Sequence, residues 1–204
     1  GTKIDTISDF SAGSDNLQIT LVAGGVNVNA VDAGDATSNA NGLSLLSSKE
    51  GEYFFNTGTS QFVMDTDGNG LIQAADLVVT MTGETGFSSA DVDFLVDATA
   101  NNVDVTTGKG DDTITVNHVN SAIDGGLGTD TVDVDASVDY SATLANIAGI
   151  EKVDLADDVL LTLSEAQLAN NALTTVTGIV GSGEILHVVA GATSAIDLSG
   201  ITTV

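Results

Sequence analysis

The chain of 204 residues contains no cysteine, no proline, no tryptophan and no arginine. Because cysteine is missing, neither a disulfide framework nor a thiolate metal site can form, and a secreted chain would need another staple, such as metal bound through oxygen. Two tyrosines and six phenylalanines are too few aromatic residues to favour a sugar-stacking site. No apolar run approaches the roughly 20 residues that a membrane-spanning helix requires.

Positive charge is scarce, since four lysines stand against 29 acidic residues and the formal net charge is −25. Nucleic acid is excluded as a partner, because neutralising phosphates requires a basic surface. Of the acidic residues, 23 are aspartate and six are glutamate. Aspartate favours turns, and its short carboxylate is a hard oxygen ligand for Ca²⁺. Such a self-repelling chain gains from bound cations, and a merely solubilising or halophilic surface is the alternative interpretation.

Two similar phrases, GKGDDTITV and GGLGTDTVD, align on Asp112 and Asp130, which are 18 residues apart. The period is half of that spacing, because an apolar residue recurs every nine residues, two positions after each aspartate. These anchors are Val96, Val105, Ile114, Ile123 and Val132. Residues 116–124 keep their apolar anchor but have lost the glycines and the aspartate of their turn. The segment between the two phrases is therefore a degenerate copy of the repeat, in register.

With these repeats the chain resembles the RTX family of secreted calcium-binding proteins, whose nonapeptide is G-G-x-G-x-D-x-U-x with U a large apolar residue. Residues 125–133 match it fully, and residues 107–115 lack only the first glycine. The resemblance implies a parallel β-roll in which two nonapeptides make one coil, with one Ca²⁺ between the two intact stacked turns. The implied ligands are two carboxylates and the carbonyls of the turns, at Asp112, Asp130, Gly108, Gly110, Gly126 and Gly128. Turns that merely punctuate hairpins are the alternative.

A second calcium motif, DTDGNGLIQAAD, occupies residues 65–76 and has the spacing of an EF-hand loop. Its candidate ligands are Asp65, Asp67, Asn69, the Leu71 carbonyl and Asp76. Position 12 is aspartate and not the usual glutamate, which resembles dockerin-like extracellular loops and favours weak binding. Two short strands are expected before the loop, about a turn at residues 56–59, and a brief helix over residues 73–77. A surface turn without metal is the alternative.

The N-terminal stretch DTISDFSAGSDNLQI resembles the segment that closes many RTX rolls. Asp5, Asp9 and Asp15 are candidate calcium ligands there, together with carbonyls of preceding turns. Aspartates that lie on the surface without a partner are the alternative. The missing preceding coils, and the absence of an initial methionine or secretory signal, predict that the chain is a piece of something longer.

We predict an all-β fold with a few short helices and a boundary near Asp97. Residues 1–97 would form a β-rich domain with the closing motif, the calcium loop and a short helix near residues 88–94. Residues 98–204 would form the β-roll, which continues as a solenoid or sandwich of short strands. One helix is expected at SEAQLANN, with Ser164 as its N-cap.

No catalytic constellation is recognisable, so the sequence predicts that the protein is not an enzyme. His118 and His187 lack a metalloprotease or nucleophile motif around them. The acid pairs Asp111-Asp112 and Asp157-Asp158 are adjacent, so in a strand they face opposite ways and cannot act as a glycosidase pair.

The sequence thus predicts a calcium-dependent, secreted structural protein of the S-layer, biofilm-matrix or fibre type, which assembles head to tail into an oligomer or polymer. Its resemblance to type I secreted proteins also makes cell-surface polysaccharide a candidate partner. The alternative is the calcium-binding, secretion-linked tail of a larger exported hydrolase, toxin or adhesin. A catalytic domain encoded upstream would decide for the tail, and a filament or lattice would decide for the structural protein.

Overall fold

The structure is a computed structural model that describes residues 4–23, 27–47, 49–99, 103–118, 122–141, 147–178, 183–190 and 202–203. Within these residues strands predominate, as the sequence predicts. The helices are α1 (Asn39–Leu43), α2 (Glu165–Asn170) and the 3-10 turn η1 (Ser89–Asp91). None of the helices in this part of the chain has the length and apolar character needed to cross a membrane.

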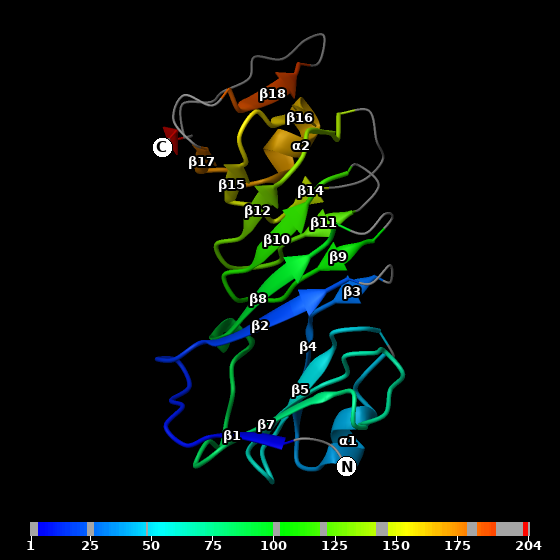
Figure 1. Cartoon of the computed structure of the whole chain (residues 1–204). Coiled ribbons are helices and arrows are strands. Elements are labelled where there is room, and N and C mark those ends of the chain that lie inside the picture. Colours follow the sequence, from blue (N-terminus) through cyan, green and yellow to red (C-terminus); the bar gives the residue numbers. More distant parts are fainter. Residues whose placement is uncertain are drawn as a thin grey trace.

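The largest sheet has seven parallel strands in the order β19-β17-β15-β12-β10-β8-β2. Figure 1 shows these strands stacked one above another, with a second parallel series beside them. The seven strands are β2 (Leu17–Val22), β8 (Val92–Asp97), β10 (Thr113–Val116), β12 (Thr131–Val134), β15 (Lys152–Leu155), β17 (Thr175–Gly178) and β19 (Thr202–Thr203).

The second series consists of two smaller parallel sheets, ordered β14-β11-β9-β3 and β13-β16-β18. The strands of the first are β3 (Val28–Asn29), β9 (Val105–Thr106), β11 (Ile123–Asp124) and β14 (Ile147–Ala148). Those of the second are β13 (Val138–Asp139), β16 (Leu160–Ser164) and β18 (Ile185–Val189). We call the seven-stranded sheet and these two sheets together the parallel stack.

The register of the strands contains the predicted period. Ile114 pairs with Val96 below it and with Val132 above it, and Ile123 pairs with Val105, so each partner is 18 residues away. All five anchors are buried, because side chains alternate between the two faces of a strand and these positions face inward. Beyond β12 the spacing widens, since Val132 pairs with Val153.

The remaining sheet is mixed and has the order β1-β7-β6-β5-β4. Its strands are β1 (Ile4–Ile7), β4 (Asp32–Ala36), β5 (Tyr53–Asn56), β6 (Gln61–Met64) and β7 (Leu77–Met81). β5 and β6 form the predicted antiparallel hairpin, and β6 is antiparallel to β7. In Figure 1 this five-stranded sheet lies below β2, at the end of the parallel stack opposite α2.

The three helix predictions have different outcomes. The predicted helix at residues 164–171 is confirmed as α2, where Ser164 and Gln167 form a capping box. The helix predicted near residues 88–94 is correct only at its start, because η1 ends at Asp91 and Val92 begins β8, whose alternate residues are buried. The helix predicted at residues 73–77 is wrong. A single turn, closed by a 3.2 Å bond from the Asp76 amide to the Gln73 carbonyl, leads directly into β7.

One apolar core extends through both halves of the chain and includes Tyr53, Phe94, Ile114 and Leu161. The rings of Tyr53 and Phe94 lie 5.8 Å apart, which joins the five-stranded sheet to the parallel stack. The predicted boundary near Asp97 falls at the end of β8, and β8 is the neighbour of β10 in the seven-stranded sheet. The sheet therefore continues across the predicted boundary. Separate folding of residues 1–97 and 98–204 stays a prediction.

Candidate metal centres

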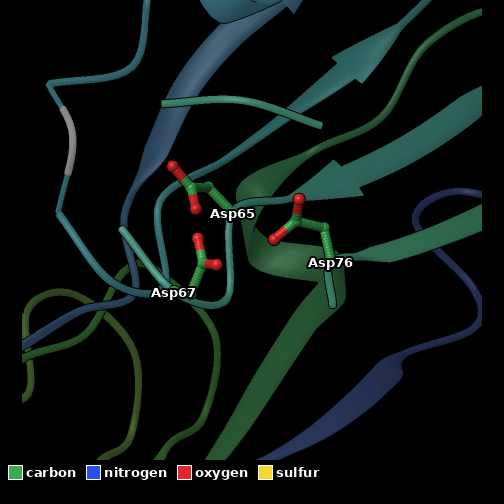
Figure 2. Close-up of side chains that lie close together, drawn as sticks. All are labelled: Asp65, Asp67 and Asp76. Atoms are coloured by element: carbon green, nitrogen blue, oxygen red, sulfur yellow. The ribbon is translucent and has the colours of Figure 1, made fainter. Parts of the chain in front are cut away.

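The loop at residues 65–76 is closed by the last pair of an antiparallel ladder, Met64 opposite Leu77. Asp65 and Asp76 directly follow and precede these strands, so the ladder fixes both ends of the loop. The carboxylates of Asp65, Asp67 and Asp76 point toward one another, and one oxygen of each lies within 4.8 Å of the others (Figure 2). Asp65 and Asp76 are buried and Asp67 is exposed. The fold therefore gathers three of the predicted ligands.

Backbone amides of the loop hold these carboxylates in place. Gly70 N–H donates to Asp65 Oδ2 (2.6 Å), Asn69 N–H to Asp65 Oδ1 (3.2 Å) and Gln73 N–H to Asp76 Oδ2 (2.7 Å). Gly70 has a φ of 71°, which favours glycine. Ile72 packs against a small apolar cluster, as expected for the residue that anchors the loop.

The other two predicted ligands, Asn69 and the Leu71 carbonyl, lie in the same loop, where the Asn69 backbone amide donates to Asp65 Oδ1 (3.2 Å) and Asp67 Oδ1 (3.3 Å). The Asn69 side-chain oxygen accepts a hydrogen bond from the Leu71 amide (2.8 Å), and the Leu71 side chain is exposed. Burial raises the pKa of Asp65, although its bonds from Gly70 and Asn69 oppose the change. Burial also raises the pKa of the neighbouring Glu50, and the charges of Asp67 and Asp65 add to that effect. The loop thus concentrates negative charge at one point.

The second predicted site lies between the turns that precede β10 and β12. Asp112 and Asp130 are only 1% and 0% exposed, an unusual environment for carboxylates. Their Oδ1 atoms accept backbone hydrogen bonds from one coil below: Phe94 N–H donates to Asp112 (2.6 Å) and Asp112 N–H donates to Asp130 (2.9 Å). Glu151 extends this series of carboxylate–amide hydrogen bonds by one coil, because its Oε2 accepts a hydrogen bond from Asp130 N–H (2.9 Å).

The second oxygen of each buried aspartate has no hydrogen-bond partner. Among the described residues, the buried side-chain oxygens in this condition are Asp112 Oδ2, Asp130 Oδ2 and the Tyr53 hydroxyl. Burying a polar group without a partner is costly, so such groups in a folded protein require an explanation. Burial raises the pKa of Asp112 to about 6. Burial also raises the pKa of Asp130 to about 7, and the negative charges of Asp112 and Glu151 raise it further.

The glycines of the turns allow the coils to approach closely. A Cβ at Gly110 would lie 1.7 Å from the Val92 carbonyl oxygen, and one at Gly128 would lie 2.1 Å from that of Gly110. A Cβ at Gly126 would lie 2.2 Å from the Gly108 carbonyl oxygen. The carbonyls of Gly108 and Gly110 therefore face the turn above. The Gly108 carbonyl accepts a hydrogen bond from Leu127 N–H (3.0 Å).

The N-terminal candidates lie elsewhere. Asp5 is an exposed residue of β1, which pairs with β7 in the five-stranded sheet, and Figure 1 shows β1 far from β10 and β12. Asp9 and Asp15 are exposed as well, and Asp15 accepts a hydrogen bond from Ser11 N–H (2.9 Å). The structure does not bring these residues to Asp112 and Asp130.

The groups considered for catalysis do not converge. His118 is half-buried and His187 is exposed, and they lie on different segments, the latter within β18. Neither acid pair lies in a strand, contrary to the expectation: Asp111 is exposed and Asp112 is buried in the turn before β10, and Asp157 and Asp158 are both exposed in the turn before β16. Two residues of the buried region were missed: Glu151, which lies 21 residues after Asp130 and so breaks the 18-residue spacing, and Tyr53, which belongs to another sheet.

A comparison of the chain with family models, with curated proteins and with solved structures finds no match in any of the three. The chemistry of the sites therefore has to be inferred from their own donors. These donors are carboxylate, carbonyl and hydroxyl oxygens, the ligands of hard cations such as Ca²⁺ and Mg²⁺.

Proposed function

We propose that this chain is a calcium-dependent extracellular structural protein of the S-layer, biofilm-matrix or fibre type, and that its parallel stack is a β-roll. The observation that carries the proposal is the pair of fully buried carboxylates in stacked turns, Asp112 and Asp130, each with an unpartnered oxygen. A purely solubilising acid would be exposed. Buried, unpaired carboxylates need a cation to offset their desolvation.

The donor set fits Ca²⁺ better than smaller cations. Ca²⁺ accepts six to eight oxygen ligands in flexible geometries, whereas Mg²⁺ demands a strict octahedron. Asp112, Asp130 and the upward-facing carbonyls of Gly108 and Gly110 would hold one ion between coils. Asp65, Asp67 and Asp76 would hold another in the loop. Bound there, the ion neutralises charge and crosslinks backbone segments, so binding energy becomes folding energy.

This dependence suits a protein that folds after export. The chain carries a net charge of −25, and cytosolic calcium is too low to fill weak sites of the extracellular kind. The chain would stay unfolded inside the cell and fold in calcium-rich surroundings.

The test is to remove calcium with a chelator at neutral pH and record the far-UV circular dichroism. We expect mostly coil without calcium and a β spectrum after calcium is restored, with native mass spectrometry counting the bound ions. Asp130→Ala should prevent the recovery, whereas Asp135→Asn, which changes an exposed acid, should not. An unchanged β spectrum in chelator would refute calcium-dependent folding.

Assembly is the second part of the proposal. β2 and β18 are outermost strands of their sheets within the described chain, and an unpaired strand edge can pair with another molecule. Both carry exposed apolar side chains, Val22 on β2 and Ile185 and Val189 on β18. Contact between unlike edges is heterologous and propagates into a fibre or sheet when its rotation does not close.

Negative-stain electron microscopy with and without calcium tests the assembly. We expect polymers in calcium that dissolve on chelation and that Val22→Lys abolishes. The matched control is Leu45→Lys, because Leu45 is also exposed but lies outside the stack. Monomers at all calcium concentrations, or polymers unaffected by Val22→Lys, would contradict head-to-tail pairing at β2.

A further inference from the structure

On the edge of the stack that carries Asp112 and Asp130, the turn above Asp130 is the first that departs from the glycine-aspartate repeat. Between β11 and β12 the turn has six residues, 125–130, and one coil higher, between β14 and β15, it has only three, residues 149–151. Ala148 pairs with Asp124, so Gly149 lies above Gly125, and Glu151 reaches the Asp130 amide. The sequence AGIE thus occupies the position of a repeat turn without its motif.

Two oxygens converge at this upper interface. The carbonyl oxygen of Gly149 and Asp130 Oδ2 lie 2.3 Å and 2.8 Å from the point where a Gly125 Cβ would stand. They are therefore within about 5 Å of each other, close enough for both to contact one ion at Ca–O distances of about 2.3–2.6 Å. Asp130 Oδ2 belongs to a side chain that is 0% exposed, and it has no hydrogen-bond partner.

The interface one coil lower, between the turns at residues 107–112 and 125–130, shows the arrangement of an intact repeat. Its equivalent residues are Thr107 and Gly125, and the Thr107 hydroxyl donates a 2.8 Å hydrogen bond to the Gly125 carbonyl. In the upper interface Gly125 takes the place of Thr107 and has no side chain to donate. The two interfaces also differ in their turn amides. Leu127 N–H donates to the Gly108 carbonyl below it, whereas Ile150 N–H donates to Asn171 Oδ1 (3.0 Å).

We propose a further cation site, for a hard divalent ion such as Ca²⁺, formed by Asp130 Oδ2, the Glu151 carboxylate and the Gly149 carbonyl. Glutamate is one methylene longer than aspartate, which suits a turn that is three residues shorter. Asp130 would then bridge two ions, with its Oδ1 edge toward Asp112 and the lower ion, and its Oδ2 edge toward Gly149 and the further ion. The unpartnered, fully buried Oδ2 distinguishes this group from an ordinary acidic surface cluster.

The site extends metal binding one coil beyond the last nonapeptide. The ion would fasten β14 and β15 to the repeat turns below them, at the point where the 18-residue spacing is lost. This inference rests on the proposed calcium dependence, but it concerns residues that the repeat motif does not include.

Native mass spectrometry of the full chain in calcium counts the ions directly. Glu151→Gln keeps an oxygen that can accept from Asp130 N–H but removes the charge, so we expect a folded protein with one bound ion fewer than the parent. Asp135→Asn, an exposed acid on the same stack, should keep the parental number. An equal number of ions in Glu151→Gln and in the parent would overturn the site.

Two further variants separate this inference from the proposed function. Glu151→Asp keeps the charge on a shorter side chain, so the ion should bind about tenfold or more weakly and return at high calcium. The same affinity in Glu151→Asp, Glu151→Gln and the parent would also overturn the site. If Asp65→Asn and Asp112→Asn each lose an ion while Glu151→Gln loses none, only the further site fails. If neither Asp65→Asn nor Asp112→Asn loses an ion, the proposed function fails with it.

Discussion

Protons should substitute for calcium in this protein, because the two buried aspartates hold them unusually tightly. The pKa values of Asp112 and Asp130 are raised to about 6 and about 7, mainly by burial, from an ordinary value of 3.8. In the unfolded chain both groups ionise near the ordinary value. Between about pH 4 and pH 7 the folded state therefore binds more protons than the unfolded state, and stability falls as the pH rises.

The size of the effect follows from the two pKa values. Each unit corresponds to about 1.4 kcal/mol, so Asp112 contributes about 3 kcal/mol and Asp130 about 4 kcal/mol between the ends of the window. The steepest slope, with both protons lost on unfolding at higher pH, is about 2.7 kcal/mol per pH unit. Coupling between the carboxyls and hydration of the turn make these upper limits. They still rival the whole stability of a typical domain, about 5–15 kcal/mol.

The assay is urea denaturation followed by circular dichroism in calcium-free buffers from pH 4 to pH 8. We expect the free energy of unfolding to fall across this range and the metal-free chain to be unfolded at its upper end. The double variant Asp112→Asn/Asp130→Asn should lose most of the slope and fold without calcium at pH 8, whereas Asp135→Asn, which changes an exposed acid just after β12, should keep the slope. A slope in the double variant equal to the parental one, or stability that rises with pH, would refute the reasoning.

Three further predictions concern single residues, each measured in saturating calcium. Gly128→Ala should lower the free energy of unfolding, measured by urea denaturation, by more than about 2 kcal/mol, because its Cβ would lie 2.1 Å from the Gly110 carbonyl oxygen. Gly83→Ala is the control: it has a positive φ but nothing within 4 Å, and it should cost about 1 kcal/mol. Equal costs would show that the close contact between coils does not limit stability. Asp65→Ala should speed hydrogen exchange at the amides of Asn69 and Gly70 and along β6 and β7, since it removes their acceptor and the loop's ligand; unchanged exchange would mean that the loop is held without this carboxylate. Phe94→Ala should lower the free energy of unfolding by about 3–5 kcal/mol, because the ring is fully buried beside Tyr53. Calorimetry should show whether the loss appears in one unfolding transition or two. A loss below about 1 kcal/mol would contradict the place of Phe94 in the shared core.

Most of the local structure could be predicted because its signals are local. The nine-residue spacing of apolar anchors determines which strands pair, and Ile114 pairs with Val96 and Val132 as that spacing requires. Ser164 and Gln167 likewise specify the start of α2 within four residues. The helix expected at residues 73–77 failed because the ladder pair of Met64 and Leu77 draws the chain directly into a strand.

The candidate sites could likewise be predicted only where the spacing of residues along the chain determines them. Spacing within one motif located Asp65, Asp67 and Asp76, and spacing between two repeats located Asp112 and Asp130. Glu151 could not be found in this way, because a shorter turn changes the period and only the stacked coils bring it to Asp130. Tyr53 could not be found either, since it comes from a sheet that joins the stack through its core.

The pairing of β2 with β8 has a consequence for the order in which the chain folds. β10 and β12 are joined by a connection that places Thr113 beside Thr131, whereas β2 must find a partner much farther along the chain, with Leu17 beside Val92. Closing the longer loop, about four times the length, costs roughly 1.3 kcal/mol more in chain entropy. The central coils are therefore expected to form first and to serve as a template, and β2, which ties the N-terminal segment to them, should dock late.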